Sequence, residues 1–231
     1  MNSMRKNATL TGVLFILATL FGVIAAAIYN PILSSADYLT SFHDHRAKAI
    51  MGSLLFFCMA MCCAGVGVSL YPVLRRFSEA AAIGSVGFRI IESMIQVVGS
   101  LFMVSLLALS SEYIQADNAS KLILQSAGGV LRAGSDWLNN SAMLLSWGVA
   151  AVIYYSAFYK YKLVPRWISV WGLIGISLTI ITSVMMMFNP DYSTIQTIAN
   201  IPIALQEMVL AVWLIVKGFS IPKTKDTQHS I

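Results

Sequence analysis

The chain has 231 residues, of which 58% are hydrophobic and only 11% are charged, and its formal net charge at pH 7 is +5. Soluble domains contain about 25% charged residues, so the composition excludes an ordinary soluble protein and indicates an integral membrane protein. The positive charge does not indicate nucleic-acid binding, because the Lys and Arg residues are scattered between apolar segments and form no basic patch.

Apolar runs of about twenty residues recur along the chain, and such runs are typical of transmembrane helices. They predict an all-α, polytopic membrane helix bundle with six spans in a single domain, residues 1–220. The spans cover approximately residues 10–28, 49–70, 80–110, 137–158, 167–188 and 198–216. Residues 221–231 are predicted to form a polar cytoplasmic tail.

The first span follows two basic residues, Arg5 and Lys6, and ends near three alanines at residues 25–27. This pattern also resembles a secretory signal peptide. A signal core has about 7–15 apolar residues, and the uncharged run here is longer. We therefore expect the first span to stay in the protein as an uncleaved membrane helix.

The loops between the predicted spans differ in charge from one side to the other. The side that holds both termini carries ten basic residues: Arg5, Lys6, Arg75, Arg76, Lys160, Lys162, Arg166, Lys217, Lys223 and Lys225. The other side carries four basic and six acidic residues: Arg46, Lys48, Lys121, Arg132, Asp37, Asp44, Glu112, Asp117, Asp136 and Asp191. Since cytoplasmic loops carry an excess of Lys and Arg, both termini are predicted to be cytoplasmic.

The segment between the third and fourth spans, residues 119–133, is too short and too polar to cross a membrane. It is predicted to lie flat on the outer surface, with a break at Gly128 and Gly129. Asn139 and Asn140 open the fourth span, where they either line a mouth of the bundle or cap the helix.

Polar residues interrupt two of the spans: Arg89, Glu92 and Gln96 in the third, and Gln206 and Glu207 in the sixth. Residues 89, 92 and 96 follow helical spacing and share one face. A charged side chain inside a membrane costs several kcal/mol unless it faces the bundle interior and finds a partner. This polar face is therefore predicted to point inward.

The third and sixth spans run in opposite directions, which places Glu92 and Glu207 at similar depth and Arg89 about one turn away. We expect these three side chains to form one buried cluster, with Gln96 and Gln206 as hydrogen-bond donors. One arginine cannot neutralise two carboxylates, so either one glutamate is protonated or a cation or protonated ligand completes the site. A purely structural role in fixing helix register is the alternative.

Neither a metal nor a cofactor is expected. The His-Asp-His sequence of residues 43–45 has no further ligands near it and indicates a solvated outer loop. Cys58, Cys62 and Cys63 lie in the second span, where cysteine usually acts as a small apolar residue. The sequence has no metalloprotease, nucleophile-elbow or phosphate-loop motif, so no enzymatic activity is indicated.

Four stretches of the sequence resemble one known family: TGVLFILATLFGV (11–23), LYPVLRRFSEAAAIGSVGFRIIES (70–93), LVPRWISVWGLIG (163–175) and PIALQEMVLAVWLIVKGF (202–219). They are similar to bacterial integral-membrane proteins known as domain of unknown function 4386. The resemblance covers about residues 8–219 and includes Arg89, Glu92 and the Leu-Gln-Glu-Met sequence at residues 205–208. It implies a multi-pass protein of the bacterial cytoplasmic (inner) membrane, and it implies no particular activity. The loop at residues 43–45 is not part of it.

Three functions are open on these grounds. The first is binding or transport of a small solute or ion by the polar residues of the third and sixth spans, because transporters bind their substrates near the bilayer midplane. The second is a regulatory or assembly role, in which the charge cluster is structural. The third is an enzyme that acts on a lipid-like substrate, with Glu92 or Glu207 as general base. The lipid bilayer and a small solute or lipid ligand are the expected partners.

Overall fold

The computed structural model describes residues 3–220, which form helices and connecting turns without a β-strand. In chain order the elements are α1 (Ser3–Leu33), α2 (Tyr38–Asp44), α3 (Arg46–Leu74), α4 (Glu79–Gln115), α5 (Asn118–Trp137), the π-helical η1 (Leu138–Ala142), α6 (Met143–Tyr161), α7 (Arg166–Phe188), the 3-10 turn η2 (Pro190–Tyr192) and α8 (Ser193–Val216). The predicted all-α fold is confirmed for this part of the chain. The predicted polar tail at residues 221–231 lies outside it.

Within residues 3–220, six helices are long and apolar enough to cross a membrane: α1, α3, α4, the continuous helix α5–η1–α6, α7 and α8. This finding confirms the six predicted apolar helices. The helices extend beyond their apolar runs, because polar residues stabilise their ends. At the start of α4, the Ser78 Oγ accepts a hydrogen bond from Ala81 N (3.2 Å) and satisfies one N–H group of the first turn.

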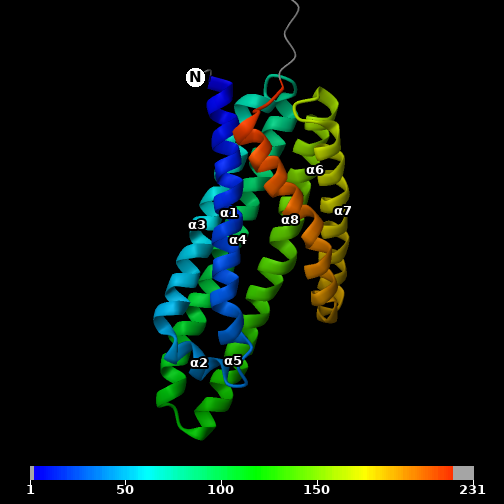
Figure 1. The fold of residues 1–231 in the computed structure, drawn as a ribbon. Helices are drawn as coiled ribbons and strands as arrows, with labels where there is room; N and C mark the ends of the chain where they lie inside the picture. Colours follow the sequence, from blue (N-terminus) through cyan, green and yellow to red (C-terminus); the bar gives the residue numbers. More distant parts are fainter. Residues whose placement is uncertain (1–2, 221–231) are drawn as a thin grey trace, which may run out of the picture.

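The long helices form a closed ring (Figure 1). Going round it, α1 packs against α3, α3 against α4, α4 against α6, α6 against α7, and α7 against α8, which returns to α1. Each helix can therefore present one face to its neighbours and another to lipid. The ring places α4, the helix with the most buried polar residues, beside α3 and α6.

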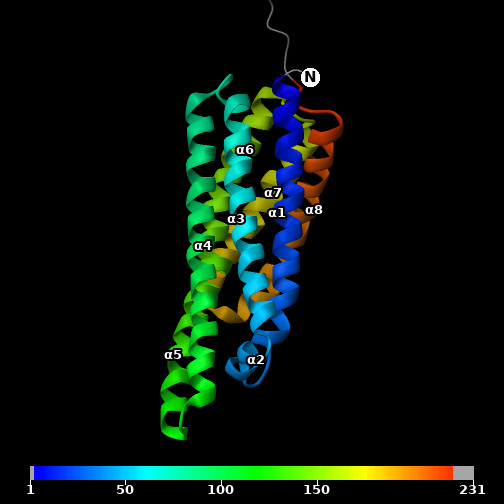
Figure 2. The same cartoon turned by 90° about the vertical axis from the view of Figure 1, so that its left-hand side faces the viewer.

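Both ends of the described chain lie at the same end of the bundle, which we call the terminal end (Figure 1). There Arg5 Nη2 donates hydrogen bonds to the backbone oxygens of Ile215 (2.6 Å) and Val216 (2.9 Å). The opposite end holds α2 and the turn between α4 and α5, and we call it the hairpin end (Figure 2).

The basic residues that the sequence assigns to one side lie at the terminal end, except Lys223 and Lys225, which fall outside the described residues. The loops thus alternate between the two ends in the predicted order. Which end faces the cytoplasm stays a prediction from the charges.

The segment at residues 119–133 differs from its prediction. It does not lie flat, and the predicted break at Gly128 and Gly129 is wrong, because α5 continues through both glycines and packs along the last turns of α4 (Figure 2). Gly128 is a packing residue: a Cβ at this position would lie 2.7 Å from Tyr38 Oη on α2. Close packing of α5 against α2 and α4 therefore outweighs the low helix propensity of two adjacent glycines.

The apolar core is densest in the terminal half of the ring. Its largest fully buried side chains include Phe15, Leu70, Tyr154, Tyr155 and Phe158. A smaller apolar cluster fills the hairpin end, where α2 packs beneath α1 and α4. Between these two clusters the inner face of α4 is polar, and the charged residues of the third span lie there.

Candidate functional site

The buried face of α4 carries a row of polar side chains: Ser85, Arg89, Glu92, Ser93, Gln96 and Ser100. Their spacing of three and four residues keeps them on one side of the helix. Arg89, Glu92 and Gln96 are 2%, 3% and 1% exposed, respectively. The prediction that these three residues share an inward-pointing face is therefore confirmed.

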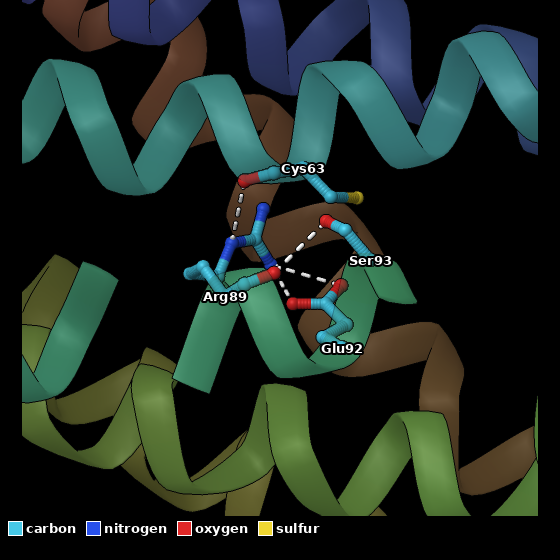
Figure 3. A network of polar contacts seen from close by, with 4 residues as sticks. All are labelled: Cys63, Arg89, Glu92 and Ser93. Carbon is cyan, nitrogen blue, oxygen red and sulfur yellow. Dashed lines mark hydrogen bonds and ion pairs between the residues drawn. The ribbon is translucent and has the colours of Figure 1, made fainter. Parts of the chain in front are cut away.

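Arg89 and Glu92 form a buried ion pair within α4 (Figure 3). Arg89 Nη1 donates to Glu92 Oε2 (2.9 Å) and Oε1 (3.2 Å), and Arg89 Nε donates to the Cys63 backbone oxygen on α3 (3.1 Å). Ser93 Oγ donates to the Arg89 backbone oxygen (2.9 Å). The pair is neutral as a unit, and the bond to Cys63 fixes the guanidinium between α3 and α4.

The guanidinium of Arg89 also lies over an aromatic ring. Its Cζ is 5.8 Å from the centre of the Phe15 ring on α1. A cation at this distance from a ring face is stabilised by about 0.5–2 kcal/mol, the larger value applying where water is excluded. Arg89 therefore links three helices of the ring: α1, α3 and its own α4.

Glu207 on α8 faces the same interior space as the ion pair. A cavity of about 110 Å³ is lined by residues of five helices: Phe15, Ala18, Thr19, Met59, Cys63, Arg89, Glu92, Met143, Leu144, Trp147 and Glu207. Arg89, Glu92 and Glu207, which the sequence analysis groups, all line this one space. Sequence reasoning misses Cys63 and Trp147, because nothing in an apolar run distinguishes a residue that lines a cavity from one that packs.

No ion pair joins Glu207 to Arg89. In the described part of the chain, Arg89 pairs with Glu92, and no Lys, Arg or His nitrogen lies within 4.0 Å of the Glu207 carboxylate. Glu207 Oε1 is fully buried and has no hydrogen-bond partner among these residues. Glu207 is therefore left without an ion-pair partner in this part of the chain.

The two glutamines have different environments from those expected. Gln206 points away from the cavity: its Oε1 accepts from Tyr155 Oη (2.5 Å), and its Nε2 donates to the Ile168 backbone oxygen (3.0 Å). It does not donate to the charge cluster, because consecutive residues of a helix point about 100° apart and Glu207 already faces the cavity. Gln96 is buried one turn from Glu92, and its Oε1 has no hydrogen-bond partner among the described residues.

A second polar cluster lies nearer the hairpin end, at the π-helical turn η1. Gln196 Nε2 on α8 donates to the Asn140 backbone oxygen (2.6 Å) and to Ser183 Oγ on α7 (3.2 Å). Asn139 Nδ2 donates to Ser135 Oγ (3.1 Å). The two asparagines lie inside a continuous helix, so the interpretation that they cap a helix start is wrong. The hydrogen bonds of Gln196 link η1, α7 and α8, whereas Asn139 bonds within its own helix.

The His-Asp-His sequence at residues 43–45 lies at the hairpin end of the bundle, where α2 ends and α3 begins. His45 Nδ1 is 3.0 Å from the Ser41 backbone oxygen, within its own turn. Within residues 3–220 no group of three or more His, Cys, Asp or Glu side chains is placed to hold a metal ion.

Comparison with known proteins gives one match. A family model described as domain of unknown function (DUF4386) matches residues 10–218, which include every residue that lines the cavity. No curated protein and no solved structure matches the chain.

Proposed function

Because this chain belongs to the DUF4386 family, whose description names no activity, we propose its function from the cavity alone: the protein binds a small cationic group there, with Glu207 as the counter-charge. The observation that carries this proposal is Glu207, which lines the cavity and whose buried Oε1 has no hydrogen-bond partner among the described residues.

The charges of the cavity support a cation. Arg89 and Glu92 neutralise each other through two hydrogen bonds, so Glu207, when ionised, carries the uncompensated charge of the site. Leaving an ion unpaired in a low-dielectric interior costs several kcal/mol. A bound cation removes this cost, and that gain is available as binding free energy.

The dimensions of the cavity limit the ligand. Sites for drug-sized molecules measure about 300–1,000 Å³, whereas this cavity measures about 110 Å³. It therefore suits an inorganic ion or a single protonated amine group. Its place among five helices near the middle of the bundle is typical of transporters, and transport of the bound cation is the activity that this position favours.

Thermal unfolding of the purified protein in mild detergent tests the proposal. Sodium chloride and methylammonium chloride are the probes, and tetramethylammonium chloride, which has no N–H donor, controls for ionic strength. Ligand at 100 times its Kd stabilises the native state by about 2.7 kcal/mol. We expect at least one probe to raise the Tm of the wild type above the control salt, and to leave the Tm of Glu207→Gln unchanged.

The matched control is Glu79→Gln, which removes an exposed glutamate at the start of α4. It should respond to the probes as the wild type does. If no probe raises the wild-type Tm above the control salt, and Glu207→Gln is as stable as the wild type, the proposal fails. A protein that then copurifies with both variants indicates the assembly role, and turnover of an added lipid indicates an enzyme.

A further inference from the structure

We infer that the ligand of this cavity is an amphiphile with a protonated primary amine, which enters sideways from the bilayer between α1 and α8. This inference rests on the proposed function and names its ligand class. It requires an opening at membrane depth, an apolar path outside the opening, and a head group that matches the free carboxylate.

The opening follows from the way α1 and α8 meet. Their contacts lie at the terminal end, where Arg5 bonds to Ile215 and Val216. Gly12 brings the helices together there, because a Cβ on Gly12 would lie 2.6 Å from the Ala211 backbone oxygen. Toward the hairpin end the two helices diverge, and α6 lies behind the space between them (Figure 1).

The exposure of the lining residues shows which side of the cavity is open. The floor, formed by Cys63, Arg89 and Glu92, is buried. Of the partly exposed lining residues, Met59 lies on α3. The other five, on α1, α6 and α8, form what we call the side mouth: Thr19, Met143, Leu144, Trp147 and Glu207. Because these helices border the space between α1 and α8, the cavity opens in that direction.

The side mouth lies at the depth of the hydrocarbon core. Glu207 is nine residues before Val216, the last residue of α8, which is about 14 Å along the helix. A hydrocarbon core is about 30 Å thick, so this position is close to its middle. The neighbouring outward side chains are apolar: Leu20 is 49% and Leu205 is 56% exposed. Acyl chains therefore lie outside the mouth, and an amphiphile reaches it more readily than a hydrated ion.

Access from the terminal end is closed by packed side chains. Tyr154, Tyr155 and Phe158 on α6 are each 0% exposed, as are Leu70 and Leu74 on α3. They fill the ring between the cavity and the terminal loops as part of one apolar cluster. A ligand that came from this end would have to displace them.

The chemistry of the cavity selects a primary amine as the head. A protonated primary amine has three N–H donors, one of which the Glu207 carboxylate can accept. The rings of Phe15 and Trp147 also line the cavity, and aromatic faces attract cations. With about 110 Å³ the cavity holds this head alone, so the chain of the ligand must lie in the opening between α1 and α8.

Photolabelling in lipid nanodiscs tests the inference. The probes are three twelve-carbon chains with a diazirine in mid-chain, and their heads are a primary amine, a trimethylammonium group and an alcohol. We expect the amine probe to label peptides of α1 and α8 near Thr19 and Leu205, at least tenfold more than the other two. Glu207→Gln should abolish this preference and leave the background labelling intact.

A pair of tryptophan variants tests the route. Thr19→Trp narrows the side mouth, and Leu20→Trp, its neighbour on the lipid-facing side, is the matched control. Labelling by the amine probe should fall at least fivefold in Thr19→Trp and stay at the wild-type level in Leu20→Trp. Wild-type labelling in Thr19→Trp would overturn the lateral route.

The result also separates this inference from the proposed function. If methylammonium or sodium raises the wild-type Tm but the amine probe labels no more than the alcohol, the cavity binds a soluble cation and the inference is wrong. Head-group comparison in the wild type needs no variant to fold, so it decides the matter even if Thr19→Trp is unstable.

Discussion

Gly67 on α3 lies directly against Arg89 on α4: a Cβ added to Gly67 would be 3.0 Å from Arg89 Cβ. The absent side chain lets the two helices approach closely, as small residues do in membrane helix packing. It thereby places the guanidinium within hydrogen-bond distance of the Cys63 carbonyl, 3.1 Å away. Part of the geometry of the charge cluster is thus set by a residue that carries no charge.

Gly67→Leu should destabilise the protein, because the larger side chain must displace Arg89 from its pair. Overpacking of this kind costs typically about 1–3 kcal/mol. Gly87→Leu on α4 is the control, since a Cβ there would meet nothing within 4 Å. Denaturant or thermal unfolding in detergent should show a lower stability for Gly67→Leu alone. Equal stabilities of the two variants would contradict the close contact.

Replacing one residue of the Arg89–Glu92 pair should lower the free energy of unfolding more than replacing both. Arg89→Met or Glu92→Met alone leaves one buried charge unpaired, at a cost of roughly 3–5 kcal/mol. The double variant leaves no unpaired charge from the pair and should recover most of that loss. The three free energies of unfolding, measured with the wild type as a double-mutant cycle, give the coupling directly. Additive effects would mean that the two side chains do not interact.

Tyr155→Phe should weaken the protein without affecting its ligand response. The change removes the hydroxyl that donates to Gln206 Oε1, and a buried acceptor without a partner costs about 1–3 kcal/mol. The Tm without ligand should therefore fall. The rise in Tm caused by the effective cation should match that of the wild type, because Gln206 does not line the cavity. A lost cation response would show that Gln206 belongs to the binding site.

The stability of the first turn of α5 should decrease at acid pH. The Asp117 carboxylate accepts a hydrogen bond from Ser120 N (3.1 Å). Hydrogen bonding from the Ser120 side chain, and next from its backbone N–H, holds the pKa of Asp117 below its ordinary value. A lowered folded-state pKa means that the cap is complete above about pH 4 and is lost as pH falls through the folded-state pKa. Hydrogen exchange of the first turn of α5 should accelerate in that range. Asp117→Asn, which does not titrate, should show no such step.

Membrane orientation can be measured with single cysteines. Ser126 on α5 and Arg76 in the loop after α3 are exposed at opposite ends of the bundle. In a background in which Cys58, Cys62 and Cys63 are changed to Ser, an impermeant maleimide should label Ser126→Cys in intact cells. Arg76→Cys should react only after the cells are broken. The reverse pattern would place the terminal end outside.

The inward polar face of α4 is predictable because two requirements coincide there. Helical periodicity places residues 89, 92 and 96 on one side, and the cost of exposing a charge to lipid forces that side inward. The position of Glu207 beside Arg89 follows in part, since depth along antiparallel helices depends only on residue count. The sequence alone does not show which of the two glutamates pairs with Arg89. Arg89 pairs with Glu92 one turn away rather than with Glu207, because the close contact between α3 and α4 fixes the guanidinium.

Features that depend on contacts between distant segments are not readable from one sequence. Gly128 and Gly129 look like a helix break, yet Gly128 is where α5 meets Tyr38 on α2. The crossing of α1 and α8, which creates the side mouth, depends on how Gly12 fits against Ala211. The packing of two helices depends on the side chains of both surfaces. Helix propensity reflects one segment alone and cannot predict it.

The continuous helix from Asn118 to Tyr161 has 44 residues, a length of about 66 Å. This is about twice the thickness of a hydrocarbon core, and the α6 half of the helix carries Trp147 at the wall of the cavity. No loop separates the two halves, so α5 continues through the π-helical turn η1 directly into the helix that lines the cavity.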